Sequence, residues 1–173
     1  MYKFKKTGLK WLKMLHLLCA CCWCGGALSL LTVNLHQYMA DSQAMLYGMN
    51  LSAHLVDVWV IIIPGANGCL VTGLIYSLFT HRGFIKHRWI AVKWLLTITA
   101  MLSGTFLLGV WEGRLLELSA AKDAVSLTDA EYARIMSKHL IAGCLQIAML
   151  LFMIWLSVFK PWKTKTPATN SDK

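Results

Sequence analysis

Three histidines stand inside or at the edges of long apolar segments, where an ionisable side chain is costly and indicates a functional site. His16 lies a few residues inside the first apolar segment, and His54 and His139 stand at matching depths at the starts of the second and fourth. Two histidines on different helices at one level can ligate a haem iron from both faces. The spacing therefore predicts a b-type haem bound by His54 and His139. The alternative is that both are interfacial and bonded to water or loop carbonyls.

Two charged residues accompany these histidines. Asp57 follows His54 by one helical turn and can orient its imidazole, which places Asp57 among the predicted cofactor-binding residues. Lys93 opens the third apolar segment at a depth comparable to that of His16, whose ring nitrogen can ligate a metal or accept a proton. The alternative for Lys93 is that its long side chain extends to the lipid headgroups.

The segment HLLCACCWCGG, which begins at His16, has two overlapping C-x-x-C spacings. On a helix, His16, Cys19 and Trp23 share one face, whereas Cys21 and Cys24 point elsewhere. Thiolate ligands in lipid would bury charge, and zinc sites of this spacing occur on loops rather than continuous helices. We therefore expect the cysteines to pack as small apolar residues, with a Cu(I) or redox site as the less favoured alternative.

The composition defines the element that must position these side chains. Hydrophobic residues make up 57% of the 173 residues and charged residues only 14%, less charge than in soluble domains. Four segments have no Asp, Glu, Lys or Arg: Met14–Val33, Val58–Phe79, Trp94–Trp111 and His139–Phe159. Each is close to the roughly 20 residues that a helix needs to cross a bilayer, and no alternating pattern indicates strands.

These segments predict an all-α, four-helix transmembrane bundle. The expected spans are about 12–35, 53–79, 89–111 and 137–159, within a single domain over residues 1–163 that is followed by a disordered tail over 164–173. The net charge of +9 does not indicate nucleic-acid binding, because 13 of the 17 basic residues lie on one side of the spans. By the positive-inside rule both termini are cytoplasmic. We expect a multi-pass protein of the bacterial cytoplasmic (inner) membrane.

Local signals refine the second and fourth spans. Pro64, near the middle of the second, predicts a kink, and Gly65, Cys69 and Gly73 form a small-residue stripe that allows another helix to approach closely. The sequence from Thr128 to Glu131 reads as a capping box with threonine as the cap, so the fourth helix is expected to begin near residue 129.

The first outer loop, expected over residues 35–51, holds a second candidate site. It contains His36, Met39, Met45 and Met49, which are soft ligands suited to Cu(I). Copper handling is therefore an alternative to haem binding. A third alternative is a cofactor-free accessory protein, in which the kink and the small-residue stripe serve packing alone.

Two short motifs resemble a known group of proteins. KWLKMLHLL, followed by Trp23 and the pair Gly25-Gly26, is similar to the first helix of a superfamily of small bacterial membrane proteins. That group includes copper-resistance D-type proteins, HemJ-type protoporphyrinogen oxidases and a family known only as predicted integral membrane proteins. The motif RWIAVKWLL also resembles the start of the third HemJ-type helix. This resemblance implies haem binding and porphyrin oxidation, with His16 as a ligand and as a catalytic residue together with Lys93.

The resemblance also implies partners. A quinone or a porphyrin is expected besides the lipid bilayer, and a homo-oligomer is left open. Two departures from the HemJ-type pattern count against the oxidase activity. The proline-arginine pair late in the first helix is replaced over residues 29–33, and the tyrosine-histidine pair after the lysine is replaced by Leu102-Ser103-Gly104. The resemblance is then better taken as one to the family of predicted membrane proteins.

Overall fold

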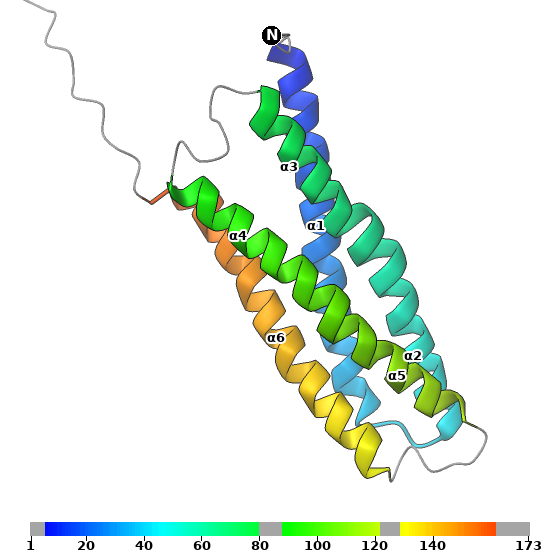
Figure 1. Ribbon diagram of the computed structural model, residues 1–173. Coiled ribbons are helices and arrows are strands. Elements are labelled where there is room, and N and C mark those ends of the chain that lie inside the picture. Colours follow the sequence, from blue (N-terminus) through cyan, green and yellow to red (C-terminus); the bar gives the residue numbers. More distant parts are fainter. Residues whose placement is uncertain (1–5, 80–87, 122–128, 162–173) are drawn as a thin grey trace, which may run out of the picture.

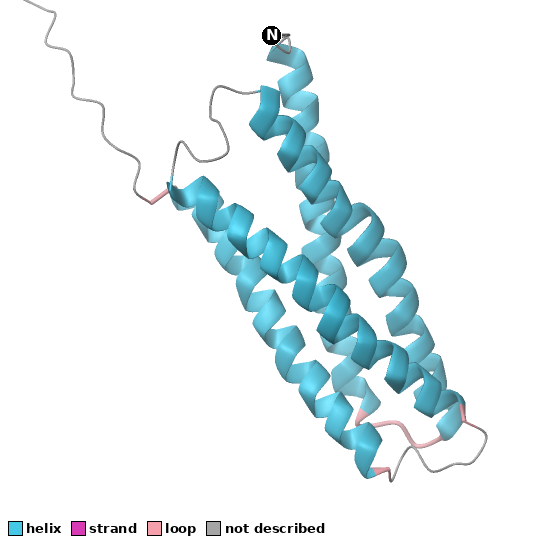
Figure 2. Cartoon of the chain, in the orientation of Figure 1, coloured by secondary structure: helices cyan, strands magenta, loops and turns pink. Residues whose placement is uncertain are grey.

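The structure is a computed structural model that describes residues 6–79, 88–121 and 129–161. Every regular element in these ranges is a helix (Figure 2). The elements are α1 (Lys6–Gln37), α2 (Gln43–Val56), η1 (Asp57–Asn67), α3 (Gly68–Phe79), α4 (Arg88–Ser103), η2 (Gly104–Leu108), α5 (Gly109–Ala120) and α6 (Ala130–Phe159). The labels η1 and η2 denote π-helical segments.

These elements join into four long helices, each long and apolar enough to cross a membrane. The second helix consists of α2, η1 and α3, and the third of α4, η2 and α5. The predicted all-α fold with four membrane-spanning helices is confirmed to this extent. The predicted tail over residues 164–173 lies outside the described residues.

The helices are longer than the predicted spans at one end of the bundle. The second begins at Gln43 rather than near residue 53, because Ser42 caps it by accepting a bond from the Met45 amide at 3.3 Å. The fourth begins at Ala130, where the Asp129 side chain accepts from the Glu131 amide at 2.8 Å. Asp129 is therefore the N-cap, whereas Thr128 lies outside the described residues.

The two ends of the bundle contain different helix ends and connections. We call the end where α1 begins and α6 ends the terminal end, and the opposite end, where α1 connects to α2, the loop end. Figure 1 shows α1 packed beside α3, and α4 beside α6, toward the terminal end. At the loop end, α2 and α5 pack together.

The region around Pro64 is a π-helix rather than a simple kink. Proline has no N–H to donate, and η1 absorbs this defect over a widened segment from Asp57 to Asn67. A second π-helical segment, η2, interrupts the third helix. Isolated π-turns are rare and frequently occur at functional sites. The two segments flank the cavity described below.

The predicted close approach of helices occurs at Gly65. A Cβ atom at this position would lie 2.9 Å from the Trp23 Cα, so the backbones of α1 and η1 touch here. On α1, Cys19 and Trp23 are buried and Cys21 is exposed, as the predicted packing face requires. Cys24, which was predicted to point elsewhere, is partly buried and packs against the central cluster of the bundle.

Two apolar clusters stabilise the bundle. The central cluster contains Cys19, Trp23, Ile61, Ala66, Cys69, Ala100, Leu150 and Met153. The loop-end cluster contains Leu46, Leu115, Tyr132 and Met136. Several polar side chains lie in the part of the bundle between these two clusters, and they form the candidate site.

Candidate functional site

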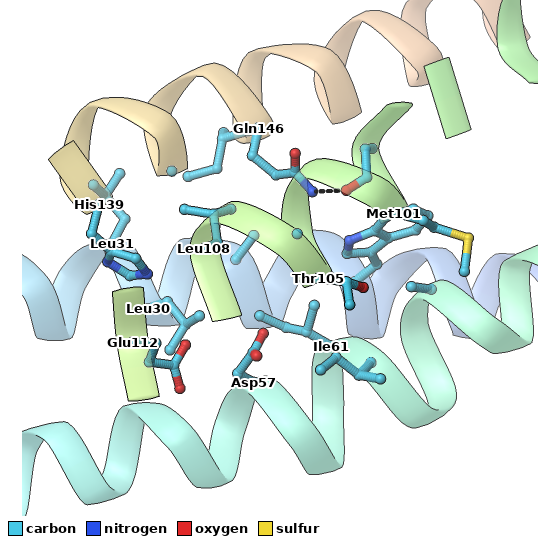
Figure 3. A pocket seen from close by; sticks show the side chains of 18 of the residues that line it. Leu30, Leu31, Asp57, Ile61, Met101, Thr105, Leu108, Glu112, His139 and Gln146 are labelled. Carbon is cyan, nitrogen blue, oxygen red and sulfur yellow. Dashed lines mark hydrogen bonds between the residues drawn. The ribbon is translucent and has the colours of Figure 1, made fainter. Parts of the chain in front are cut away.

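A cavity lies beside the central cluster, and its lining is mostly apolar with several polar side chains among the apolar ones. Its volume is about 100 Å³, enough for a few water molecules at roughly 30 Å³ each. Five of the helical elements supply polar side chains to its lining: Asn34 from α1, Asp57 and Asn67 from η1, Thr105 from η2, Glu112 from α5, and His139 and Gln146 from α6. Figure 3 shows the Asp57 and Glu112 carboxyl groups turned toward the space below His139 and Leu30.

Glu112 is the most unusual residue of this cavity. It is only 3% exposed, although it carries a carboxyl group in a helix that is long enough to span a membrane. Its Oε1 atom lies 3.3 Å from His54 Nδ1. The two groups are close enough for an ion pair, but Oε1 accepts no hydrogen bond within the described residues. A buried polar atom without a partner is costly and calls for a proton, a cation or water to complete it.

Asp57 and His54 connect Glu112 to two different environments. Asp57 is partly buried, lines the cavity and lies within electrostatic range of both Glu112 and His54. The side chain of His54 is 43% exposed, so it faces the surface on one side and Glu112 on the other. The expected proximity of Asp57 to His54 is therefore present, whereas the direct contact of His54 is with Glu112.

His139 faces the cavity from the fourth helix and is 3% exposed. Asn34 Nδ2 lies 3.1 Å from His139 Nδ1 across the interface of α1 and α6. Since the amide nitrogen is a donor, Nδ1 accepts, and the neutral ring carries its proton on Nε2. This bond fixes the orientation of the ring against α1.

Gln146 closes the cavity at its deeper end. Its Nε2 donates to the Ala100 carbonyl at 2.8 Å, shown by the dashed line in Figure 3, and its Oε1 accepts from the Ser103 hydroxyl at 3.0 Å. Both partners lie in the last turns of α4, just before the π-helical segment η2. The amide therefore fixes α6 against the third helix at the point where that helix changes its hydrogen-bonding pattern.

This geometry does not fit a haem held between His54 and His139. His139 lines the cavity, whereas His54 lies outside its lining and faces Glu112. A volume of about 100 Å³ is also small beside the roughly 300–1,000 Å³ of small-molecule sites. The haem stays a prediction that these contacts do not support.

The predicted catalytic pair, His16 and Lys93, lies in the terminal half of the bundle. His16 Nδ1 is 2.8 Å from the Thr72 hydroxyl, and Lys93 Nζ is 2.6 Å from the Ser157 hydroxyl. His16 and Lys93 are within electrostatic range of each other. The structure thus brings the two predicted residues together, on the opposite side of the central cluster from the cavity.

The copper candidates are spread over two elements. Met45 and Met49 lie on α2, whereas Met39 lies in the connection before it. The His36 ring bonds to the carbonyl of Thr32 at 2.9 Å. Within residues 6–79, 88–121 and 129–161, no group of three or more His, Cys, Asp or Glu side chains is arranged to hold a metal ion.

Comparison with known proteins adds no relative: no protein family, no curated protein and no solved structure gives a significant match to this chain. The superfamily resemblance and the oxidase activity it implies therefore stay predictions.

Five polar residues of the cavity were not among the predicted site residues: Asn34, Asn67, Thr105, Glu112 and Gln146. The sequence could have indicated Glu112, because this residue directly follows the uncharged segment that ends at Trp111. A carboxyl group at such a position is costly and indicates a functional residue. Asn34 and Gln146 are uncharged polar residues, whose direction depends on helix rotation. That rotation is set by packing.

Proposed function

We propose that this chain is a multi-pass integral membrane protein that binds and releases a proton at Glu112, as part of a proton-coupled membrane process. Both termini are cytoplasmic in this proposal, so the cavity lies in the outer half of the bacterial cytoplasmic membrane. The observation that carries the proposal is the Glu112 carboxyl group, which is 97% buried and whose Oε1 atom accepts no hydrogen bond among the described residues.

A carboxylate in this position needs a positive charge. An uncompensated ion in a low-dielectric interior costs several kcal/mol, so Glu112 must be neutralised by a proton, by the His54 imidazolium or by a metal cation. Asp57 is a second carboxyl group within electrostatic range of Glu112. If both carboxyl groups were ionised, they would repel each other, which also favours a proton or a cation at Glu112. The described side chains supply no group of three metal ligands. A proton is then the species that this set of residues handles most simply.

The surroundings provide a route for that proton. His54 is 43% exposed at its side chain and lies 3.3 Å from Glu112, so it can pass a proton between the loop-end surface and the buried carboxyl group. Beyond Glu112, the cavity has room for a few waters, and Asp57 and His139 line it. Chains of Asp, Glu and His within membrane segments are typical of proton relays. Asn34 holds the His139 ring in place at the far side of the cavity.

Infrared spectroscopy of the full chain in lipid vesicles tests this proposal. A protonated carboxyl group absorbs at a different frequency from a carboxylate, so a pH titration should reveal a carboxylic acid band that belongs to a buried side chain. We expect that band to be lost in Glu112→Gln, which keeps the side-chain shape. In His54→Gln the band should remain, and its exchange in deuterated water should become slower.

Glu117→Gln is the matched control. It removes the same group from the same helix, α5, but from a side chain that is 71% exposed and paired with Arg114. The buried carboxyl band should persist in this variant. A spectrum of Glu112→Gln identical to that of the unaltered chain would exclude Glu112 as the proton-binding group.

A further inference from the structure

Lys93 links two of the long helices in the terminal half. It extends from α4, donates to Ser157 on α6, and lies within electrostatic range of His16 on α1 and Cys69 on α3. Its side chain therefore points into the bundle, and only partial exposure remains. One of its three N–H donors goes to Ser157, which leaves two for other acceptors.

Among the described residues, the charge of Lys93 has no acidic counterpart in this half of the protein. All six acidic residues that the structure describes lie toward the loop end: Asp41, Asp57, Glu112, Glu117, Asp129 and Glu131. The neighbouring side chains within the described terminal half are either basic or neutral. A cation in such a position is stabilised by an anion, and here that anion must come from outside the described residues.

The depth of Lys93 matches that of a lipid headgroup. It lies five residues after Arg88, the first residue of α4, which is roughly 7.5 Å along the helix at 1.5 Å per residue. Its partner Ser157 stands two residues before the end of α6 at Phe159. The headgroup layer is about 5–7 Å thick on each side of the hydrocarbon, so a phosphate at this level can reach the ammonium group.

We infer that the terminal end of the bundle binds the phosphate of an anionic phospholipid, with Lys93 as the principal cation and the His16–Thr72 pair beside it. Basic sites between transmembrane helices on the cytoplasmic side are known to hold anionic lipid headgroups. Thr72 donates to the Gly68 carbonyl, so toward His16 its oxygen accepts and the His16 Nδ1–H donates. The ring is thereby fixed within electrostatic range of Lys93. This site is separate from the Glu112 cavity and does not depend on the proposed function.

Native mass spectrometry of the full chain in a nonionic detergent tests this inference. The probes are phosphatidylglycerol and phosphatidylcholine with identical acyl chains. We expect the anionic lipid to bind more tightly, and Lys93→Met to weaken its binding about fivefold, from the energy typical of one basic residue near an anionic surface. Lys93→Arg, which keeps the charge, should retain most of the affinity.

Lys10→Met is the matched control, because Lys10 is an exposed lysine at the same end of the bundle. It should leave phosphatidylglycerol binding unchanged. Equal loss in Lys10→Met and Lys93→Met would mean attraction to a general basic surface and would overturn the site. Displacement of the lipid by inorganic phosphate at equal affinity would also overturn it, in favour of a free phosphate. Tryptophan fluorescence confirms that each variant is folded. If Lys93→Met is not folded, the unaltered chain still decides, because equal affinity for phosphatidylglycerol and phosphatidylcholine would overturn the site.

Discussion

The two halves of the bundle bury polar groups in opposite ways. In the loop half, buried polar side chains bond to one another across helices, as Gln37, Asn50 and Tyr132 do, and the only charges that enter the interior are the carboxyl groups of Asp57 and Glu112. In the terminal half, the buried charge is the single ammonium group of Lys93, bonded to a neutral hydroxyl. The described part of each half therefore carries one sign of charge in its interior.

This difference indicates two kinds of external partner. A buried carboxyl group can be neutralised by a proton, which needs only a water-sized cavity and a surface histidine such as His54. A lysine is already protonated and gains from an anion, which for a residue near the helix ends is a lipid phosphate. The central cluster, with Trp23 and Ile61, separates the two polar regions by apolar side chains. Substitutions at the centre, in the loop half and on the surface should therefore differ in how much they destabilise the protein.

The largest effect is expected where the two halves are joined. In Gly65→Leu, a side chain would have to fit where even a Cβ lies 2.9 Å from the Trp23 Cα. Backbone cannot move aside as a flexible side chain can, so α1 and η1 must separate. We expect the free energy of unfolding to fall by about 3 kcal/mol or more, and little folded protein to be recovered in size-exclusion chromatography.

Gly25→Leu is the matched control for that change. Gly25 lies near the middle of α1, and a Cβ atom at this position would meet nothing within 4 Å. This variant should elute and unfold like the unaltered chain. Equal recovery of Gly65→Leu and Gly25→Leu would show that the close approach at Gly65 is not needed to join the halves.

A smaller loss of stability is expected in the polar network of the loop half. Asn50 is 1% exposed, accepts from Gln37 at 3.2 Å and donates to the Tyr132 hydroxyl at 2.9 Å. Asn50→Ala leaves both partners buried without these bonds, which costs about 2 kcal/mol. Thermal unfolding in detergent, followed by tryptophan fluorescence, should show a lower Tm.

Ser52→Ala serves as the comparison for Asn50. Ser52 stands on the same helix, and its exposed hydroxyl bonds only to the Gly48 carbonyl one turn back. Its removal should leave Tm unchanged. If Asn50→Ala also left Tm unchanged, the stability of the loop half would rest on its apolar cluster rather than on the buried hydrogen bonds.

The helical architecture was predictable because the bilayer imposes a minimum length on uncharged segments. The start of α2 at Gln43 was not, since the residues before His54 are too polar to read as a span although they form a helix that extends past it. The π-helical segments η1 and η2 also escaped prediction. Proline marks a defect, but whether the helix kinks or widens depends on the helix packed against it.

The candidate site was predictable only in part. Depth along the helices indicated that His16 and Lys93 lie at one level, and the two are within electrostatic range of each other, but their roles stay predictions. It did not show that His54 faces Glu112, because equal depth leaves the rotation of each helix open. That rotation determines which histidine meets the cavity. The two histidines of the predicted pair consequently have different partners: His54 contacts Glu112, and His139 bonds to Asn34.

The smallest effect is expected for the surface charges of the loop half. Arg114 bonds to Glu131 at 3.1 Å, which links α5 to α6 on the outside of the bundle, and to Glu117 of its own helix at 3.3 Å. Water competes for such exposed groups and salt screens them, so their pairing adds little to stability. Arg114→Ala should therefore leave Tm unchanged, at low and high salt alike. A fall in Tm as large as that of Asn50→Ala would mean that the loop half is held by its surface charges, and that burial is not what distinguishes its polar contacts.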